Sequence, residues 1–100
     1  MFFVAVHKWN LYDYLNVAKK IFVALANLPE GVSLCSSYVS NDAAWCVYTS
    51  DSIAKGKQIQ TYMTEKVPEM KTEVTPVLQF FPPSPNIYML IQNLLDITSQ

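Results

Sequence analysis

The chain has 100 residues, a length that holds one domain with one core. Hydrophobic residues make up 51% of the chain and charged residues 15%, which excludes an intrinsically disordered chain and a coiled coil. Seven lysines, no arginine and eight acidic residues give a formal net charge of −1 without a block of either sign, so nucleic acid is not an expected partner.

The apolar segments are too short to cross a membrane. The two longest, Ile21 to Leu28 and Ile87 to Leu95, are interrupted by amides and fall short of the roughly 20 residues that a transmembrane helix needs. The opening MFFVAV lacks the basic region of a signal peptide and stops at His7-Lys8, so we interpret it as a strand. We therefore expect a soluble cytoplasmic protein without a membrane partner.

The first strand is predicted from Phe2 to Trp9, where aromatic and β-branched residues are concentrated. Both of its faces are largely apolar, which is typical of a strand that is covered on both sides. One face carries Phe3, Ala5, His7 and Trp9, and the other carries Phe2, Val4, Val6 and Lys8.

The first helix is predicted to start at Asn10, a good capping residue, and to end at Pro29-Glu30-Gly31. Its apolar residues recur at helical spacing, while Lys19 and Lys20 lie away from them. The predicted buried stripe consists of Leu11, Leu15, Ala18, Ile21 or Phe22, Leu25 and Leu28.

A β-hairpin is predicted from two runs of strand formers, Val32 to Val39 and Ala43 to Thr49, around a turn cluster at Ser40-Asn41-Asp42. The loop length decides which residues share a face, because an odd loop breaks the grouping that an even loop produces. With an even loop, one face carries Cys35, Cys46 and Tyr48, and the other carries Leu34, Tyr38, Trp45 and Val47.

The second half of the chain predicts a helix and a strand. The helix is capped by Ser50 or Asp51 and ends at Pro68, and Gly56 within it marks a close contact or a soft point. The strand runs from Lys71 to Phe81, and we place it at a sheet edge or bulge because Pro76 cannot donate a backbone hydrogen bond.

A third, strongly apolar helix is predicted from Ser84-Pro85 to about Thr98. Before it, the order β-α-β-β-α-β predicts a ferredoxin-like α+β fold, with a four-stranded antiparallel sheet and two helices on one face. We therefore expect a ferredoxin-like domain over residues 1–81 and a C-terminal helical extension over 82–100. The second sheet face would be rich in aromatic residues, and since such a face is usually covered by another subunit, we expect a homodimer.

Two segments resemble a known family. Leu-Pro-Glu-Gly-Val at 28–32, with Tyr38 near the end of the following strand, and Glu-Val-Thr-Pro-Val at 73–77 resemble an uncharacterised family of small domains in the dimeric α/β-barrel superfamily. The resemblance covers about residues 1–80 and implies a ferredoxin-like fold assembled as a dimeric barrel. Its superfamily relatives include cofactor-independent monooxygenases, haem-dependent enzymes and isomerases, so the resemblance implies a range of activities. The chain differs from the family at His7, where an aromatic residue is more usual, and in its third helix.

The candidate site residues are few. His7 is the candidate catalytic residue, since it is the side chain that titrates near neutral pH, and we expect it to face a cavity between two sheets. A structural histidine is the alternative. Cys35 and Cys46 have no metal-ligand spacing and are interpreted as buried, inert thiols, and no metal is expected. The candidate ligand-binding residues, each of which could instead belong to core or interface, are His7, Trp9, Tyr38 and Trp45.

Three classes of function follow from the sequence. The first is a homodimeric domain that binds a small apolar or aromatic molecule between the sheet and the helices. The second is a monooxygenase-like or isomerase-like enzyme that uses His7 for proton transfer. The third is a non-catalytic protein interaction module. The sequence identifies neither the ligand nor a cofactor.

Overall fold

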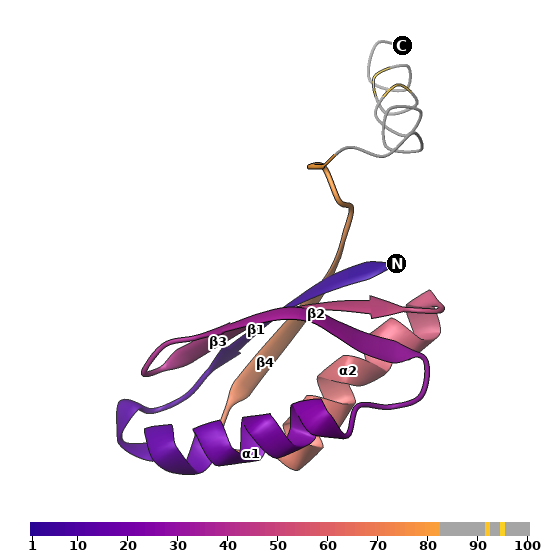
Figure 1. Ribbon diagram of the computed structural model, residues 1–100. Helices are drawn as coiled ribbons and strands as arrows, with labels where there is room; N and C mark the ends of the chain where they lie inside the picture. Colours follow the sequence, from indigo (N-terminus) through magenta and orange to yellow (C-terminus); the bar gives the residue numbers. More distant parts are fainter. Residues whose placement is uncertain (83–91, 93–94, 96–100) are drawn as a thin grey trace.

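The computed structural model describes residues 1–82, 92 and 95. Its elements are β1 (Phe2–Lys8), a 3₁₀ turn (Leu11–Asp13), α1 (Tyr14–Ala26), β2 (Val32–Val39), β3 (Ala43–Ser50), α2 (Ile53–Lys66) and β4 (Lys71–Val77). The four strands form one antiparallel sheet in the order β2-β3-β1-β4, and both helices lie on one side of it (Figure 1). This confirms the predicted α+β class with a four-stranded antiparallel sheet and two helices. The helix predicted over 84–98 lies outside the described residues, apart from Gln92 and Leu95.

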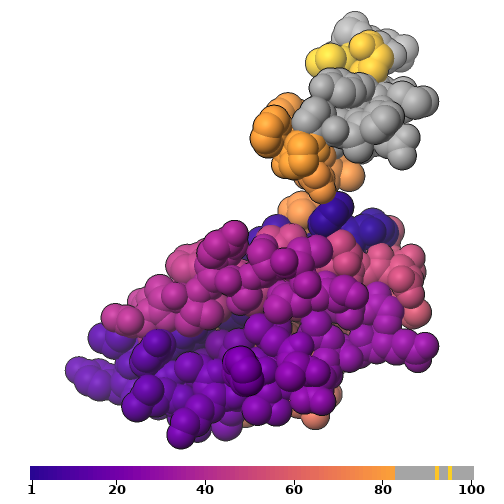
Figure 2. All heavy atoms as spheres, in the orientation of Figure 1, coloured from indigo at the N-terminus to yellow at the C-terminus, as the bar shows by residue number. Residues whose placement is uncertain are grey.

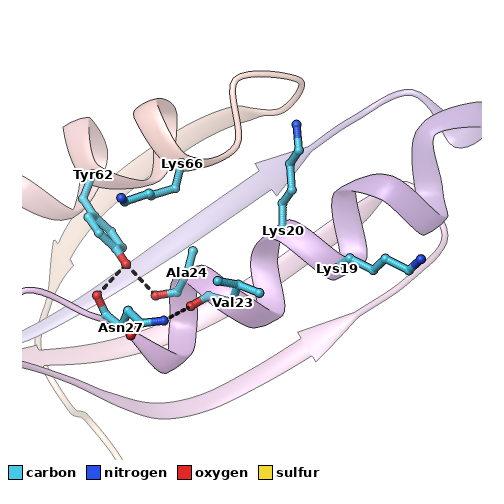
Figure 3. Close-up of a pocket in the computed structure, with 7 residues that line it drawn as sticks. All are labelled: Lys19, Lys20, Val23, Ala24, Asn27, Tyr62 and Lys66. Carbon is cyan, nitrogen blue, oxygen red and sulfur yellow. Dashed lines mark hydrogen bonds between the residues drawn. The ribbon is translucent and has the colours of Figure 1, made fainter.

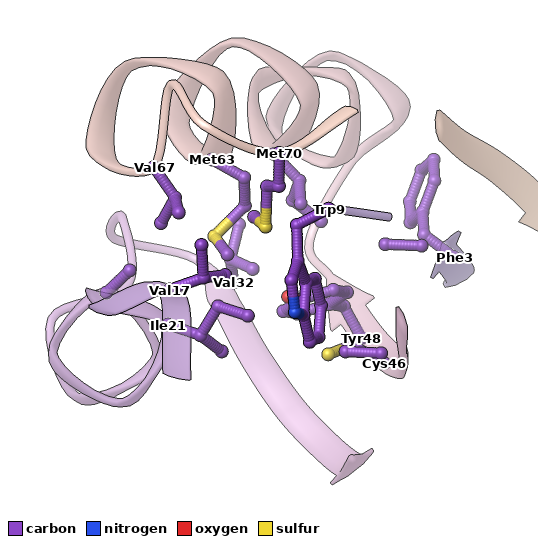
Figure 4. Close-up of a cluster of buried hydrophobic side chains, with 14 residues drawn as sticks. Phe3, Trp9, Val17, Ile21, Val32, Cys46, Tyr48, Met63, Val67 and Met70 are labelled. Carbon is purple, nitrogen blue, oxygen red and sulfur yellow. The ribbon is translucent and has the colours of Figure 1, made fainter. Parts of the chain in front are cut away.

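The core fills the space between the sheet and the two helices. Alternate residues of β1 point toward the helices, and Phe3 and Ala5 pair across the sheet with Tyr48 and Cys46 of β3. Because cross-strand partners share a face, these pairs form a continuous covered face. The side chains of both helices close over it (Figure 4). The main core residues are Phe3, Ala5, Val17, Ile21, Val32, Cys46, Tyr48, Ile59, Met63 and Val67.

Gly56 lets α2 approach the sheet closely. A Cβ atom placed on Gly56 would lie 2.0 Å from the Cε2 and Cζ atoms of the Phe3 ring. No side chain larger than hydrogen fits there without a shift of the ring or the helix, and Phe3 itself is buried. Of the two alternatives predicted for Gly56, a close contact or a soft point in the helix, the close contact is therefore confirmed.

The orientation of α1 differs from the prediction. The helix turns Val17, Ile21 and Ala24 toward the core, whereas Leu15 and Phe22 are 72% and 77% exposed. The predicted stripe is confirmed at Ile21, which is buried, and at Leu25 and Leu28, which pack partly against the core. It is wrong at Leu11, Leu15 and the alternative Phe22, which are exposed. The helix carries two apolar stripes, and hydrophobic periodicity alone does not say which of them faces the sheet.

In the part of the chain that the structure describes, no helix is long and apolar enough to cross a membrane.

The hairpin forms as predicted, but β2 contains a bulge between Leu34 and Ser36. On the loop side of the bulge, Tyr38 pairs with Trp45 and Ser36 pairs with Val47. On the other side of the bulge the pairing is shifted, so that Leu34 pairs with Tyr48, whose side chain lies on the face that the helices cover. The expected grouping of Leu34 with Trp45 is therefore wrong. Cys35, in the bulge, is exposed and only Cys46 is buried, so the prediction of two buried thiols holds for Cys46 alone.

β4 is an edge strand, as Pro76 predicts, and its outer edge is partly closed. The side-chain amide of Gln60, on α2, donates to the carbonyl oxygen of Thr72 and its Oε1 accepts a hydrogen bond of 3.0 Å from the Val74 amide. Pro76 is the next residue whose backbone faces away from β1, and it has no N–H to donate. This edge therefore presents few free donors to another strand.

Candidate functional site

The structure divides the four predicted ligand-binding residues between two faces of the sheet. His7 and Trp9 lie on the covered face and are buried, whereas Tyr38 and Trp45 pair with each other on the opposite face. The four side chains therefore do not line one pocket. The expectation that His7 faces a cavity between two sheets is wrong, because β1 turns Phe3, Ala5 and His7 toward the helices.

His7 is fully buried beneath the helix layer. Its Nδ1 atom lies 2.9 Å from the Thr72 hydroxyl of β4, and its Nε2 atom has no hydrogen-bond partner in the described part of the protein. Burial lowers its pKa from 6.5 to about 4, because the charged imidazolium loses its hydration there. The imidazole is therefore neutral at pH 7. With no exposed surface it offers no route to a substrate, and its catalytic role stays a prediction.

Trp9 links the end of β1 to the hairpin loop. Its indole N–H donates a hydrogen bond of 2.8 Å to the carbonyl of Asn41, and its backbone N–H donates one of 3.0 Å to the carbonyl of Asp42. The ring itself is 8% exposed. These contacts hold the end of β1 against the hairpin loop, so Trp9 has a structural role. Its role in ligand binding stays a prediction.

The second face of the sheet is not covered by either helix and is rich in apolar residues, although Ser36, Thr49 and Thr75 also lie on it. We call it the open face. Tyr38 remains 65% exposed and Trp45 43% exposed, although both belong to regular strands. The charged residues of this face, Lys8, Lys71 and Glu73, lie together at one end of the β1–β4 pair. The apolar part of the open face consists of Phe2, Val4, Val6, Tyr38, Trp45, Val47 and Val77.

The chain after β4 extends the apolar surface at the other end of the open face. Leu78, Phe80 and Phe81 are 62%, 72% and 84% exposed, and this segment projects beyond the sheet (Figure 2). A cleft of about 310 Å³ lies where it leaves the strands. The cleft is lined by Phe2, Val47, Val77, Gln79, Phe81 and Pro82.

A separate cleft of about 360 Å³ lies between α1 and α2 (Figure 3). We call it the inter-helix cleft. The Lys20 ammonium pairs with the Glu69 carboxylate at 2.6 Å, and this hydrogen bond is the main reason that the pKa of Glu69 is lowered. The Lys66 ammonium lies 5.8 Å from the centre of the Tyr62 ring. The cleft is lined by Lys19, Lys20, Val23, Ala24, Asn27, Tyr62 and Lys66.

Tyr62 joins the two walls of the inter-helix cleft. Its hydroxyl lies 2.7 Å from the carbonyl oxygen of Ala24 and 2.6 Å from that of Asn27, at the C-terminal end of α1, and it donates to this pair. The last carbonyls of a helix lack the usual partner four residues on, and here the phenol adds to the hydrogen bond of 3.2 Å that the Asn27 amide donates to the Ala24 carbonyl. Burial raises the pKa of Tyr62, which keeps the donor protonated at neutral pH.

Replacing Tyr62 by Phe is expected to lower the free energy of unfolding by about 1 kcal/mol, the usual net value of one hydrogen bond. The change removes the hydroxyl and keeps the ring. Tyr12→Phe is the matched control, because Tyr12 is 96% exposed and no change in stability is expected there. Urea unfolding of the three proteins measures the difference, and equal losses in both variants would contradict the capping role of Tyr62.

Sequence reasoning did not identify the inter-helix cleft. It placed Lys19 and Lys20 on the solvent side of the first helix, and it assigned no role to Tyr62 or Lys66. The two groups are about 40 positions apart in the chain, and no local motif connects them. One local pattern pointed to this site: Tyr62 and Lys66 are four residues apart in the predicted second helix and therefore lie on one face of it.

Comparisons with known proteins support the fold and do not identify an activity. No protein-family model matches the chain, and no curated protein sequence matches it. Among solved structures, the chain is similar to one described as an unknown protein from Galdieria sulphuraria, with 17% sequence identity and a TM-score of 0.56. The match covers 95% of this chain and 62% of that one, so this chain spans less than two thirds of that protein. At this identity the likeness shows the fold alone, and the resemblance to dimeric α/β-barrel domains stays a prediction.

Proposed function

We propose that this chain is a homodimeric assembly domain in which two copies pack open face against open face. The element order β-α-β-β-α-β and the sheet order β2-β3-β1-β4 support a ferredoxin-like fold, and two such sheets face to face would form a dimeric α/β barrel. Membership in that superfamily is part of the same proposal.

The observation that carries the proposal is the apolar open face. A soluble domain rarely leaves a contiguous apolar patch of several hundred Å² in water, and partner binding is the usual reason for one. Four strands about 4.8 Å apart and about 24 Å long offer roughly 450 Å² on each face. Two copies would thus bury roughly 900 Å², the size of a small interface, which is typical of a weak dimer. Aromatic side chains such as Trp45 and Tyr38 are the residue types that dominate binding energy in interfaces.

The sheet edges favour packing through faces. Gln60 and Pro76 limit hydrogen bonding along the outer edge of β4, and the bulge at Cys35 interrupts β2 at the opposite edge. Both features are common devices that prevent edge-to-edge pairing. Association through the open face avoids both edges.

The other functions predicted from the sequence have less support. An enzyme that uses His7 needs a substrate to reach a fully buried imidazole. A small apolar molecule between the sheet and the helices would have to displace tightly packed side chains, among them Phe3, Tyr48 and Met63, which are almost fully buried. Neither of the two clefts described above is lined by His7, Trp9, Tyr38 or Trp45.

The test is the oligomeric state of the Trp45→Lys variant. A lysine in place of Trp45 would bury two ammonium groups in a symmetric dimer and remove two aromatic contacts, so we expect the dimer to dissociate at least about 100-fold more readily. Phe22→Lys on α1 is the matched control, because Phe22 is an exposed aromatic residue on the helix side. Sedimentation equilibrium over micromolar concentrations measures both variants.

The expected result is a dimeric wild-type protein, a monomeric Trp45→Lys variant and a dimeric Phe22→Lys variant. A wild-type protein that is monomeric at tens of micromolar would overturn the proposal. Dissociation caused by Phe22→Lys alone would instead place the contact on α1. Far-ultraviolet circular dichroism of each variant separates dissociation from unfolding.

A further inference from the structure

We propose that the inter-helix cleft binds a small molecule that combines an apolar body with one anionic group, such as a carboxylate or a sulfonate. The site and its ligand class are independent of the proposed dimer. The cleft lies in the helix layer, on the opposite side of the sheet from the open face, so it stays accessible in a dimer formed through the open faces (Figure 1).

The size and walls of the cleft suit a small organic molecule. Its volume of about 360 Å³ is within the range of small-molecule sites. Val23 and Ala24 of α1 supply aliphatic surface, and Tyr62 of α2 supplies an aromatic wall (Figure 3). Because the Tyr62 hydroxyl is already engaged by the carbonyls at the end of α1, the ring offers mainly its apolar surface to a ligand.

The charge of the lining residues selects an anion. The whole chain has a net charge of −1, yet three of its seven lysines line this cleft and no acidic residue does. Lys20 is neutralised by Glu69. Lys19 and Lys66 form no ion pair within the part of the chain that the structure describes. The Lys66 ammonium lies at the Tyr62 end of the cleft, whereas the Lys19 ammonium points away at the other end (Figure 3), so Lys66 is the cation available to an anion beside the aromatic wall.

The position of Lys66 places one cation beside the apolar wall. Its ammonium lies 5.8 Å from the centre of the Tyr62 ring, a distance at which the ring face attracts a cation. An anion bound to Lys66 therefore has its apolar part next to Tyr62 and Val23. This juxtaposition favours a molecule with both features over a simple inorganic anion.

The test compares two fluorescent probes that share one aromatic ring system. Anilinonaphthalene sulfonate carries an anionic group, and phenylnaphthylamine is its uncharged counterpart. We expect Lys66→Gln to raise the dissociation constant of the sulfonate roughly threefold, the effect of losing one partly exposed charge contact. The same variant should bind the uncharged probe as the wild type does. Added salt should weaken binding of the sulfonate to the wild type only.

The matched control is Lys71→Gln, which removes one exposed lysine from the charged end of the open face. This control should leave the sulfonate affinity unchanged. If it weakens binding as much as Lys66→Gln does, or if neither variant changes the affinity, the proposal is overturned. Amide chemical shifts provide a second readout on the wild type. With the sulfonate, we expect changes at Val23, Asn27 and Tyr62, and changes confined to Val6, Trp45 and Val47 would place the probe on the open face instead.

Discussion

Acidification from pH 7 to pH 4 is expected to cost the wild-type protein about 3 kcal/mol of folding free energy through His7 alone. The pKa of His7 falls from 6.5 in the unfolded chain to about 4 in the fold, and each unit corresponds to about 1.4 kcal/mol. Between these two values the unfolded state binds a proton that the folded state does not, so stability decreases as the pH falls. The loss starts near pH 6.5 and is almost complete at pH 4.

The His7→Phe variant isolates this contribution. Phenylalanine keeps a ring of similar size and cannot titrate, and at pH 7 it removes an unpartnered Nε2 atom while leaving the Thr72 hydroxyl without the imidazole. These two effects oppose each other, so we expect a change within about 1 kcal/mol at pH 7. Urea unfolding at several pH values should then show two curves that separate below pH 6.5.

The comparison is specific for His7 because other acidic transitions are common to both proteins. The Glu69 carboxyl, whose pKa the Lys20 hydrogen bond lowers, loses its stabilising charge at a lower pH in wild type and variant alike. Parallel stability curves for the two proteins from pH 7 to pH 4 would show that the pKa of His7 is the same in the folded protein as in the unfolded chain. Such a result would return His7 to consideration as a functional residue.

The Gly56→Ala substitution is expected to lower the free energy of unfolding by about 2 kcal/mol. In an exposed helix the same change is stabilising by about 1 kcal/mol, because alanine has the higher helix propensity. Here the new methyl group would lie 2.0 Å from two carbons of the Phe3 ring, so overpacking outweighs propensity. Lys57→Ala, one residue along α2 and exposed, is the control and should change stability little.

A double-mutant cycle with Phe3→Leu tests the cause. Leucine lacks the Cε2 and Cζ atoms that the alanine methyl would meet, so Gly56→Ala should cost much less in the Phe3→Leu background. Thermal or urea unfolding of the four proteins yields the coupling energy. If Gly56→Ala stabilises the wild-type protein, α2 does not approach β1 as closely as described.

The secondary structure follows largely from local residue patterns. Asn10 accepts a hydrogen bond of 3.0 Å from the Tyr12 amide at the start of the first helical turn, as its capping preference predicts. Gly31, with φ of +82°, allows the turn that leads into β2. Pro76 lies at an edge because its missing N–H excludes it from a central strand. These features depend on the covalent chemistry of single residues, and neighbouring elements do not alter it.

The assignment of faces depended on tertiary packing. Alternation in β1 shows that Phe3, Ala5 and His7 share a side, but both sides are apolar, so the pattern does not say which one the helices cover. The same ambiguity affects α1, whose Leu15 and Phe22 stripe is outside while Val17 and Ile21 are inside. In each case two apolar surfaces compete, and the one that fits the opposing layer is buried.

The sequence by itself determined the order of the elements, the cap at Asn10, the turn at Gly31 and the antiparallel four-stranded sheet. The cap predicted for α2 at Ser50 or Asp51 is wrong, because the Ser52 side chain accepts the hydrogen bond of the Lys55 amide and several polar residues in a row leave the first turn undefined.

Only the tertiary structure decided that His7 is sealed beneath the helices, that the face shared by Tyr38 and Trp45 is the open one, and that residues from α1 and α2 form a cleft. Local propensity acts between residues close in the chain. Burial, the pKa of His7 and the contact of Tyr62 with Ala24 and Asn27 arise instead from contacts between distant segments, and these exist only once the layers have packed.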